Sequence, residues 1–215
     1  MITISRLFDD YDTAVRAVGD LERAGISNSD ISILANNSDG WYESDRPSAV
    51  TRPAMTRGIG RDHRDVDGPR EGADTGAVIG GTVGGVAGLL AGLGMLAIPG
   101  LGPVVAAGWL VSTAALAVGG GAVGGIIGAL TQVGVSEDDA HVYAEGVRRG
   151  GTLVTARVPE ADAARVEAIL DRSAVDVRER AVLYERSGWR RFDPNASPYT
   201  ADEIRREREN FRTRD

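Results

Sequence analysis

Two histidines that lie among acidic residues are the side chains best suited to chemistry in this sequence. His63 lies in the charged run 62–67, and His141 follows three acids at 137–139. Carboxylates beside an imidazole could bind a metal ion or exchange protons, but the first run lacks the spacing and the glycine of a calcium loop. The second group follows Ser136, an order typical of a capped helix N-terminus. We therefore interpret the first group as solvated charges and the second as a helix cap, and we predict no metal site and no catalytic residue.

A glycine-rich match to the pattern G-x-G-x-x-G at residues 119–124 could suggest a dinucleotide site. In such sites the pattern follows a β-strand and opens a helix, so that the backbone can approach a pyrophosphate. Here we expect no strand before the pattern, and further glycines surround it at a spacing of four. No serine has a G-x-S-x-G setting or a partner histidine. The sequence therefore predicts no cofactor and a protein that is not an enzyme.

The composition excludes further chemistry, because the chain has no cysteine and all 24 of its basic residues are arginine. Disulfides, thiolate nucleophiles, Schiff-base lysines and Walker-A lysines are therefore impossible. Acids outnumber arginines in residues 1–74 (14 to 9) and in residues 137–215 (17 to 15), so we expect no nucleic-acid partner. The first six residues alternate as in a strand, unlike a signal peptide, which predicts a cytoplasmic location for the folded part.

Periodicity predicts two strand–helix–strand units, one on each side of the centre of the chain. In the first unit, strands at 2–8 and 30–34 flank one helix. This helix starts after the acids at 9–12, which favour a helix N-terminus, and it ends at Gly25, a residue type that commonly ends helices. Residues 2–34 are therefore predicted to form a βαβ unit.

The second unit follows the centre of the chain. An additional helix at 137–149 leads to a strand at 152–158, Pro159 then opens a helix, and a strand at 174–178 closes the unit. Two such units in one chain predict a ferredoxin-like α+β sandwich, in which four strands share one sheet backed by helices. Each half is too small to fold alone, so we expect the halves to pair across the intervening sequence.

These predictions divide the chain into five parts. The two halves of the ferredoxin-like domain are separated by a polar stretch and a glycine-rich stretch, and a charged tail follows them. The parts are 1–35 for the first βαβ half, 36–74 for a flexible polar linker, 75–135 for a glycine-rich helical hairpin, 136–182 for the second half, and 183–215 for a tail with a short helix.

The glycine-rich part carries no charge over the 62 residues from Thr75 to Ser136, and it holds 18 of the 29 glycines. Glycine recurs at every fourth position in two rows, and this spacing places the glycines on one face of a helix, where two helices can approach closely. We predict a helical hairpin with arms at 76–98 and 104–133. The packing residues are Gly76, Gly80, Gly84, Gly88, Gly92, Gly120, Gly124 and Gly128, and the turn residues are Pro99, Gly100, Gly102 and Pro103.

Two environments fit the predicted hairpin. The first arm, 23 residues at about 1.5 Å per residue, would be ~34 Å long, enough for a hydrocarbon core of ~30 Å. A bilayer enforces helical structure, whereas in water each glycine in a helix costs about 1 kcal/mol relative to alanine. We therefore expect a hairpin inserted in or lying on the inner membrane, with membrane lipid as a partner. The alternative is a soluble homo-oligomer in which hairpins from several copies bury one another.

The tail contains aromatic residues and one helix signal. Thr200 and Glu203 form a capping box that opens a charged helix. Trp189, Phe192 and Tyr199 precede this helix. We expect them to dock on the domain of their own chain, or on a protein partner that the sequence leaves unidentified.

The order of the segments carries a family resemblance. A βαβ unit, a polar linker and the turn Pro-Gly-Leu-Gly-Pro are followed by Gly-Val-Ser-Glu-Asp-Asp-Ala at 134–140, Tyr143, and Arg-Gly-Gly-Thr-Leu-Val at 149–154. Over roughly residues 1–180, this order resembles the bacterial heat-induced general stress protein family. The resemblance implies stress-linked expression and no established catalytic activity, and it supplies no catalytic residue. It does not account for the long linker or for the tail.

We therefore expect a non-enzymatic general stress-response protein that acts through association. Its glycine-rich hairpin would meet the inner membrane or other copies of the chain, and its α+β domain would lie in the cytoplasm. The alternatives are a soluble self-assembling oligomer and a domain that senses a small molecule on its sheet. The sensing alternative depends on fold analogy alone.

Overall fold

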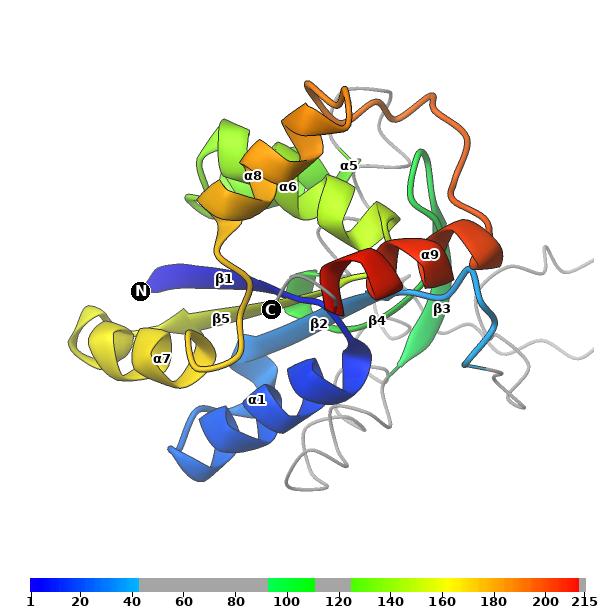
Figure 1. Ribbon diagram of the computed structural model, residues 1–215. Helices are drawn as coiled ribbons and strands as arrows, with labels where there is room; N and C mark the ends of the chain where they lie inside the picture. The colour runs from blue at the N-terminus through cyan, green and yellow to red at the C-terminus, as the bar shows by residue number, and fades with distance from the viewer. Residues whose placement is uncertain (43–92, 111–124, 213–215) are drawn as a thin grey trace, which may run out of the picture.

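The computed structural model describes residues 1–42, 93–110 and 125–212. These residues form an α+β protein built on one five-stranded antiparallel sheet with the strand order β1-β5-β2-β4-β3 (Figure 1). The strands are β1 (Ile2–Phe8), β2 (Ile31–Asn36), β3 (Gly94–Ile98), β4 (Gly102–Gly108) and β5 (Thr152–Val158). The helices are α1 (Tyr11–Arg23), α5 (Gly125–Gln132), α6 (Glu137–Arg148), α7 (Ala163–Leu170), α8 (Val177–Arg186) and α9 (Ala201–Arg212), with short 3-10 turns at Asn28–Asp30 and Glu160–Asp162.

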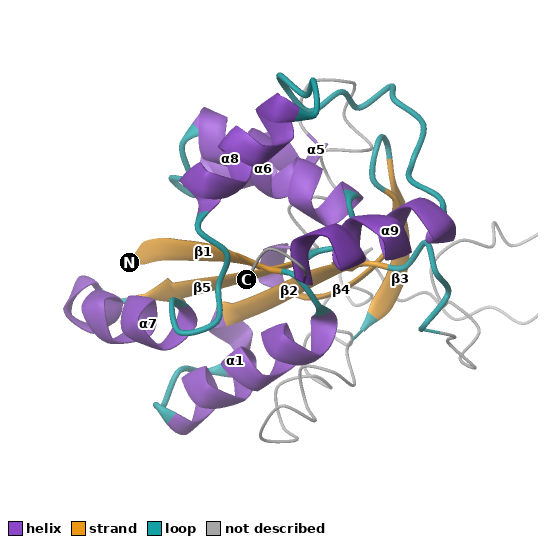
Figure 2. Cartoon of the chain, in the orientation of Figure 1, coloured by secondary structure: helices purple, strands orange, loops and turns teal. Residues whose placement is uncertain are grey.

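The sheet lies between two layers of helices (Figures 1 and 2). α1 and α7 cover one face, where Phe8, Leu21 and Val154 belong to a buried apolar core. α5 and α6 cover the other face, with α8 packed against α6, and there Val147 and Leu153 belong to a second core. Because β2 and β5 lie in the middle of the sheet, both of their faces are buried. Their sequences therefore lack the strict polar–apolar alternation of a half-exposed strand.

β5 lies between β1 and β2 and is antiparallel to both. Ile4 of β1 and Ile31 of β2 pair with the same residue of β5, Ala156. The βαβ unit formed by β1, α1 and β2 is therefore split, because a strand from the second half of the chain inserts between its two strands. The three strands predicted for this region are confirmed, and the two halves of the chain do pair across the intervening sequence.

The strand predicted over 174–178 is wrong. The N–H of Val175 donates one hydrogen bond to the carbonyl of Leu7, at 2.8 Å, along the outer edge of β1, and α8 begins two residues later. The cause is Asp176, whose carboxylate accepts hydrogen bonds from the backbone N–H groups two and three positions further on, at 2.8 and 3.0 Å. These bonds cap a helix, and two alternating valines are too short a pattern to outweigh the cap.

The helical hairpin predicted from the glycine rows is wrong over residues 94–108, whereas the end of its second arm is helical as predicted, in α5. Residues 94–98 and 102–108 form β3 and β4, an antiparallel β-hairpin that extends the sheet beyond β2. The glycine rows describe only local spacing, whereas the edge of β2 presents backbone groups that need hydrogen-bond partners. Ile98, Val104 and Val105 also have branched side chains that favour strands.

The turn of this hairpin lies where it was predicted, although it joins strands instead of helices. Pro99 and Gly100 lie in the turn, and Gly102 and Pro103 begin β4. Gly100 and Gly102 have φ angles of +77° and +82°, in the left-handed region that favours glycine. The turn residues were therefore predicted correctly from composition, because the requirement for glycine is local.

Most of the predicted packing glycines lie outside the described residues, namely Gly76, Gly80, Gly84, Gly88, Gly92, Gly120 and Gly124. Gly128 lies on α5 and is half-buried. The fully buried side chains of α5 are those of Ile126, Ala129 and Leu130, and this helix packs on α6. Among the described residues, no helix combines the length and the apolar character needed to cross a bilayer.

Candidate functional site: a C-terminal strap fastened by arginines

His141, one of the two chemical candidates in the sequence, lies on α6 beside a helix cap. The hydroxyl of Ser136 accepts a hydrogen bond from the N–H of Asp139 at 3.1 Å, which confirms the predicted cap. His141 is 8% exposed, and its Nε2 lies 3.8 Å from Oε1 of Glu137, which also pairs with Arg191. Burial lowers the pKa of His141, and the positive charge of Arg191 lowers it further. These two effects favour the neutral imidazole and outweigh the carboxylates of Glu137 and Asp138, which raise the pKa.

The remaining candidates from the sequence lie elsewhere. The charged run around His63 and the glycine pattern at 119–124 lie outside the described residues. Within the described ranges, no three side chains of histidine, cysteine, aspartate or glutamate come together as metal ligands would.

Charged side chains do converge at the C-terminal end of α6. The Glu145 side chain is fully buried, and its carboxylate accepts a hydrogen bond from Nε of Arg149 at 2.7 Å and one from Nη1 of Arg148 at 3.2 Å. Both arginines lie at the helix C-terminus, where positive charge interacts favourably with the helix dipole. Since a buried carboxylate is strongly destabilising without charged partners, the three side chains form one structural group.

Arg149 also holds the C-terminal segment, residues 187–212, which we call the strap. Its Nη1 donates to Oε1 of Glu207 in α9 at 2.5 Å. Its guanidinium carbon lies 4.4 Å from the ring centre of Tyr184 in α8 and 5.6 Å from that of Tyr199 in the strap. A cation above aromatic rings gains a further attraction from the ring electrons. One side chain thus joins α6, α8 and the strap.

Two other arginines fasten the strap at further points. Arg148 lies 4.8 Å from the ring centre of Tyr199. Arg208, in the strap, donates from Nη1 to Asp39 and from Nη2 to the carbonyl of Gly150, both at 2.9 Å. The strap is therefore attached to the end of α6 and to the segment that follows β2, which are far apart in the sequence and adjacent in space.

Two apolar side chains anchor the strap, Phe192 at 6% exposure and Ile204 at 0%. Phe192 packs on the β3–β4 turn, where a Cβ added to Gly100 would lie 2.9 Å from its ring. Ile204 packs on Gly150, where an added Cβ would lie 2.4 Å from its Cγ2. Both glycines have positive φ angles, so each is required by its backbone as well as by the close approach of the strap.

The turn predicted from the sequence is thus also a contact surface. A Cβ on Gly102 would lie 2.7 Å from Cβ of Pro198 in the strap. The capping box predicted at the start of α9 is confirmed: the N–H of Thr200 donates to Oε2 of Glu203 at 2.8 Å, and the N–H of Glu203 donates to the Thr200 hydroxyl at 3.4 Å. The tail therefore docks on the domain of its own chain.

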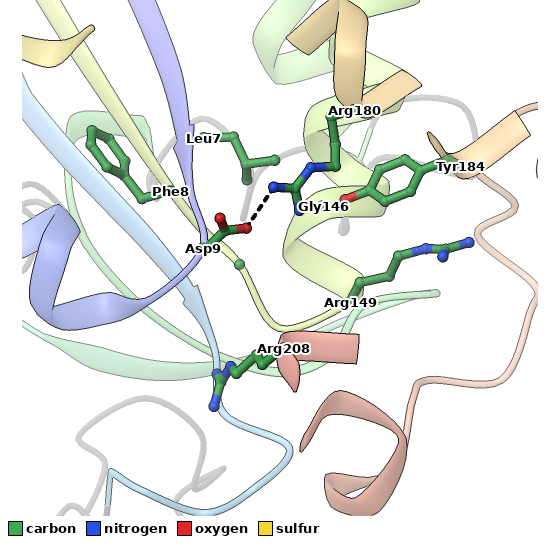
Figure 3. Close-up of a pocket in the computed structure, with 9 residues that line it drawn as sticks. Leu7, Phe8, Asp9, Gly146, Arg149, Arg180, Tyr184 and Arg208 are labelled. Atoms are coloured by element: carbon green, nitrogen blue, oxygen red, sulfur yellow. Dashed lines mark ion pairs between the residues drawn. The ribbon is translucent and has the colours of Figure 1, made fainter. Parts of the chain in front are cut away.

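A small open pocket lies where the strap, α6, α8 and the end of β1 meet (Figure 3). Nη2 of Arg180 pairs with Oδ1 of Asp9 at 2.8 Å, whereas the guanidinium groups of Arg149 and Arg208 point away from this pair and from each other. The arginines therefore act as separate fasteners and do not form one convergent anion site. The pocket has an empty volume of about 230 Å³, open mouth included, and its lining residues are Leu7, Phe8, Asp9, Gly146, Arg149, Gly151, Arg180, Tyr184 and Arg208.

The tyrosines around these arginines remain protonated. Burial raises the pKa of Tyr184 above its ordinary value, although the charges of Arg180 and Arg149 and a hydrogen bond with Arg180 lower it. Burial also raises the pKa of Tyr199, against the charges of Arg149 and Arg148. The two rings therefore contribute to binding as neutral aromatic surfaces below arginine side chains.

A second group of contacts, which we call the clasp, is formed by Asn37, Tyr42 and Leu93. The amide of Asn37 donates to the carbonyl of Tyr42 at 3.1 Å and accepts from its N–H at 2.9 Å, and the Tyr42 hydroxyl donates to the carbonyl of Leu93 at 3.3 Å. The backbone N–H of Asn37 donates to the carbonyl of Pro103 in β4 at 2.9 Å. Residues 42 and 93 are therefore held together.

Sequence reasoning missed both the strap contacts and the clasp. Asn37 was assigned to the polar linker, although it is 5% exposed. For the arginine network, the one local signal was the spacing of four between Glu145 and Arg149, which favours an ion pair on a helix. The partner Glu207 lies 58 residues beyond Arg149, and no periodic pattern connects residues at that distance.

The fold and the site define an α+β protein whose C-terminal strap is docked on its own domain by arginine ion pairs. Comparisons of the chain with protein-family models, with curated proteins and with solved structures found no match.

Proposed function

We propose that this protein is a non-enzymatic general stress-response protein that acts by associating with other copies of itself. Its α+β domain is a folded platform, and the uncharged glycine-rich sequence between Thr75 and Ser136 provides the contacts. The observation that carries this proposal is the position of β3 and β4. They are the middle of the uncharged window, and they extend the sheet beyond β2, with β3 as the edge strand.

The clasp supports the same proposal. The Tyr42 hydroxyl donates to the carbonyl of Leu93, and Leu93 immediately precedes the edge strand β3, so the residues on either side of 43–92 lie at this edge of the sheet. The converging charges of the described domain are satisfied internally, since Glu145 and Glu207 bind the same arginine. The domain thus leaves the neighbouring uncharged sequence to provide the contacts, and small residues in such a sequence allow two backbones to approach closely.

Contact with the inner membrane is the second environment proposed for the glycine rows. It is supported by the 62 uncharged residues of the window, since charge is what a bilayer interior excludes most strongly.

The ferredoxin-like interpretation of the sheet also belongs to the proposal. What supports it is the position of β5 between β1 and β2, because this split arrangement is the core of that fold.

Light scattering on the full chain in detergent-free buffer, combined with fractionation of expressing cells, tests the proposal. Association predicts a soluble particle that is a multiple of the 22.6 kDa chain. Recovery in a membrane pellet that resists carbonate and high salt would instead support the lipid environment. A monomer in the soluble fraction at all concentrations would overturn both versions.

A pair of variants in the first glycine row makes the test specific. Gly84→Leu should reduce the particle size or weaken the membrane attachment, because leucine prevents close approach at a packing position. Thr82→Leu adds a leucine to the same stretch outside the two rows and should leave association unchanged. Equal effects of the two substitutions would show that the glycine spacing has no role.

A further inference from the structure

The strap is attached to a domain whose cores hardly depend on it. Of the buried residues that form the two cores in the described part of the chain, Phe192 alone comes from the strap. The other strong contacts are the packing of Ile204 on Gly150, and ion pairs and aromatic contacts at the rim of the domain. The strap could therefore leave without opening either core, and the uncovered surface would still contain groups that water can solvate.

The surface under the strap has a defined chemistry. It consists of the end of α6, with Arg148, Arg149 and Gly150, and of the β3–β4 turn, with Gly100 and Gly102. Two guanidinium groups favour a carboxylate and an aromatic ring, and the glycines leave room for apolar side chains at short distance. We call these five residues the docking surface.

The strap carries groups that match the docking surface. Tyr199 lies over the two arginines, Glu207 pairs with Arg149, and Phe192 and Ile204 lie against the glycines. Gly188, whose φ is +90° and where an added Cβ would meet no atom within 4 Å, lies at the start of the strap, just after α8. Residues 189–200 form neither helix nor strand, so the strap can move about this residue without unfolding a regular element.

We propose that the docking surface is a binding site for a segment that presents a carboxylate beside aromatic residues, and that the strap of a second copy of this chain is its partner. In an isolated copy, the chain's own strap occupies the site. A tethered segment has an effective concentration on the order of millimolar, so it excludes the strap of another copy in dilute solution. When copies are concentrated, or when a strap is released, the same contacts form between two chains, because the partner segment is chemically identical. This inference goes beyond association through glycine and does not depend on it.

A fluorescein-labelled peptide of residues 187–209 tests the site when it is titrated with the full-length protein and followed by anisotropy. The variant that combines Phe192→Ala with Glu207→Ala weakens the protein's own strap and leaves the docking surface intact. It should bind the peptide at least about tenfold more tightly than the wild-type protein, because the internal competitor is weakened. Higher salt should weaken this binding, since charged groups contribute to it.

Matched variants separate the docking surface from general effects. Arg148→Met in the released background removes the contacts with Tyr199 and with the carbonyl of Ser197, and also the weaker of the two bonds to Glu145, but it leaves the pair between Glu145 and Arg149. It should reduce peptide binding about tenfold or more. Asp202→Asn, an exposed residue on the same helix as Glu207, should bind the peptide as wild type does.

Two results would overturn the proposal. The first is equal peptide affinity of the wild-type protein and the released variant, and the second is peptide binding that Arg148→Met leaves unchanged. If circular dichroism shows that Phe192→Ala unfolds the domain, Glu207→Ala alone is compared with the wild-type protein. The expected gain in peptide affinity is then smaller. The same measurements in a Gly84→Leu background keep this test independent of the association proposed for the glycine rows.

Discussion

Replacing Glu145 by alanine should destabilise the domain, because it leaves two arginines at a buried position without their shared carboxylate. The Glu145 side chain is 0% exposed, and those of Arg149 and Arg148 are 8% and 15% exposed. Breaking a buried ion pair by removing one partner typically costs about 3–5 kcal/mol. Since Arg149 keeps its contact with Glu207, we expect the lower end, about 3 kcal/mol.

Two further variants refine this expectation. Glu145→Gln keeps the shape and one acceptor oxygen, so it should cost less, about 1 kcal/mol, which is the difference between a charge-assisted and a neutral hydrogen bond. Arg149→Met should destabilise less when Glu145→Ala is already present than when it is made alone, because the unpaired charge is then absent. This double-mutant cycle measures the coupling of the pair directly.

The assay is urea unfolding followed by tryptophan fluorescence, with the free energy of unfolding extrapolated to water. The matched control is Glu137→Ala, at the other end of α6, because this carboxylate is 60% exposed and its pairs are expected to contribute at most about 1 kcal/mol. If Glu145→Ala lost no more stability than Glu137→Ala, the buried network could not have the structural role that its geometry indicates.

Three further predictions concern the backbone, pH and the segment between β2 and β3. Gly108→Ala should lose more stability in urea unfolding than Gly188→Ala. Both glycines have φ near +90°, where a residue with a Cβ is strained by about 1–2 kcal/mol. Of the two, only Gly108 has an atom in the way of an added Cβ, the carbonyl oxygen of Ile31 at 2.3 Å. Equal losses would contradict the steric argument. Stability should fall as the pH is lowered below about 6.5, because burial holds the pKa of His141 in the folded state below its unfolded value. The contribution of the neutral imidazole to the free energy of unfolding is fully present above the pKa of His141 in the unfolded state. It is lost as the pH falls through the pKa of His141 in the folded state. In thermal melts between pH 7 and pH 5, the variant His141→Gln should therefore lose less stability than the wild-type protein. An equal loss in both proteins would refute the assignment of this pH dependence to His141. Replacing residues 43–92 by a four-residue Gly/Ser linker should leave the domain folded, because the clasp holds residues 42 and 93 together. Closing a connection of four residues instead of 50 also costs less entropy, by about 2 kcal/mol. Loss of the near-UV circular dichroism signal, with or without a change in the far-UV signal, would show that the domain needs this segment.

Local sequence signals predicted the parts of the fold that local interactions decide. Ser136 caps α6, and Thr200 with Glu203 caps α9, as their spacing of three indicated. The strands at 2–8 and 152–158 were predicted because their residue types favour a sheet. In each of these cases, the residues that determine the structure lie within a few positions of one another.

Contacts between distant segments decided the parts that sequence reasoning missed. A glycine spacing of four suits a helix, but residues 102–108 pair with β2, which lies about seventy residues earlier and has an edge to fill. Arg208 pairs with Asp39 across 169 residues. Neither contact leaves a periodic signal. Asp176 is the opposite case, because the capping signal was local but was outweighed in the prediction by two alternating valines.

The planar shape of Arg149 explains why stability and strap docking are linked but separable. Its Nε binds Glu145 in α6, its Nη1 binds Glu207 in α9, its Nη2 donates to Ser187 at 3.4 Å, and its face lies over Tyr184 in α8. A lysine ammonium has its three donors on one atom and could not make these directed bonds in one plane. The buried carboxylate fixes the guanidinium within the domain, and the second carboxylate docks on the group already fixed. It follows that loss of Glu145 should weaken both the domain and the strap, whereas loss of Glu207 should release the strap and leave the domain folded.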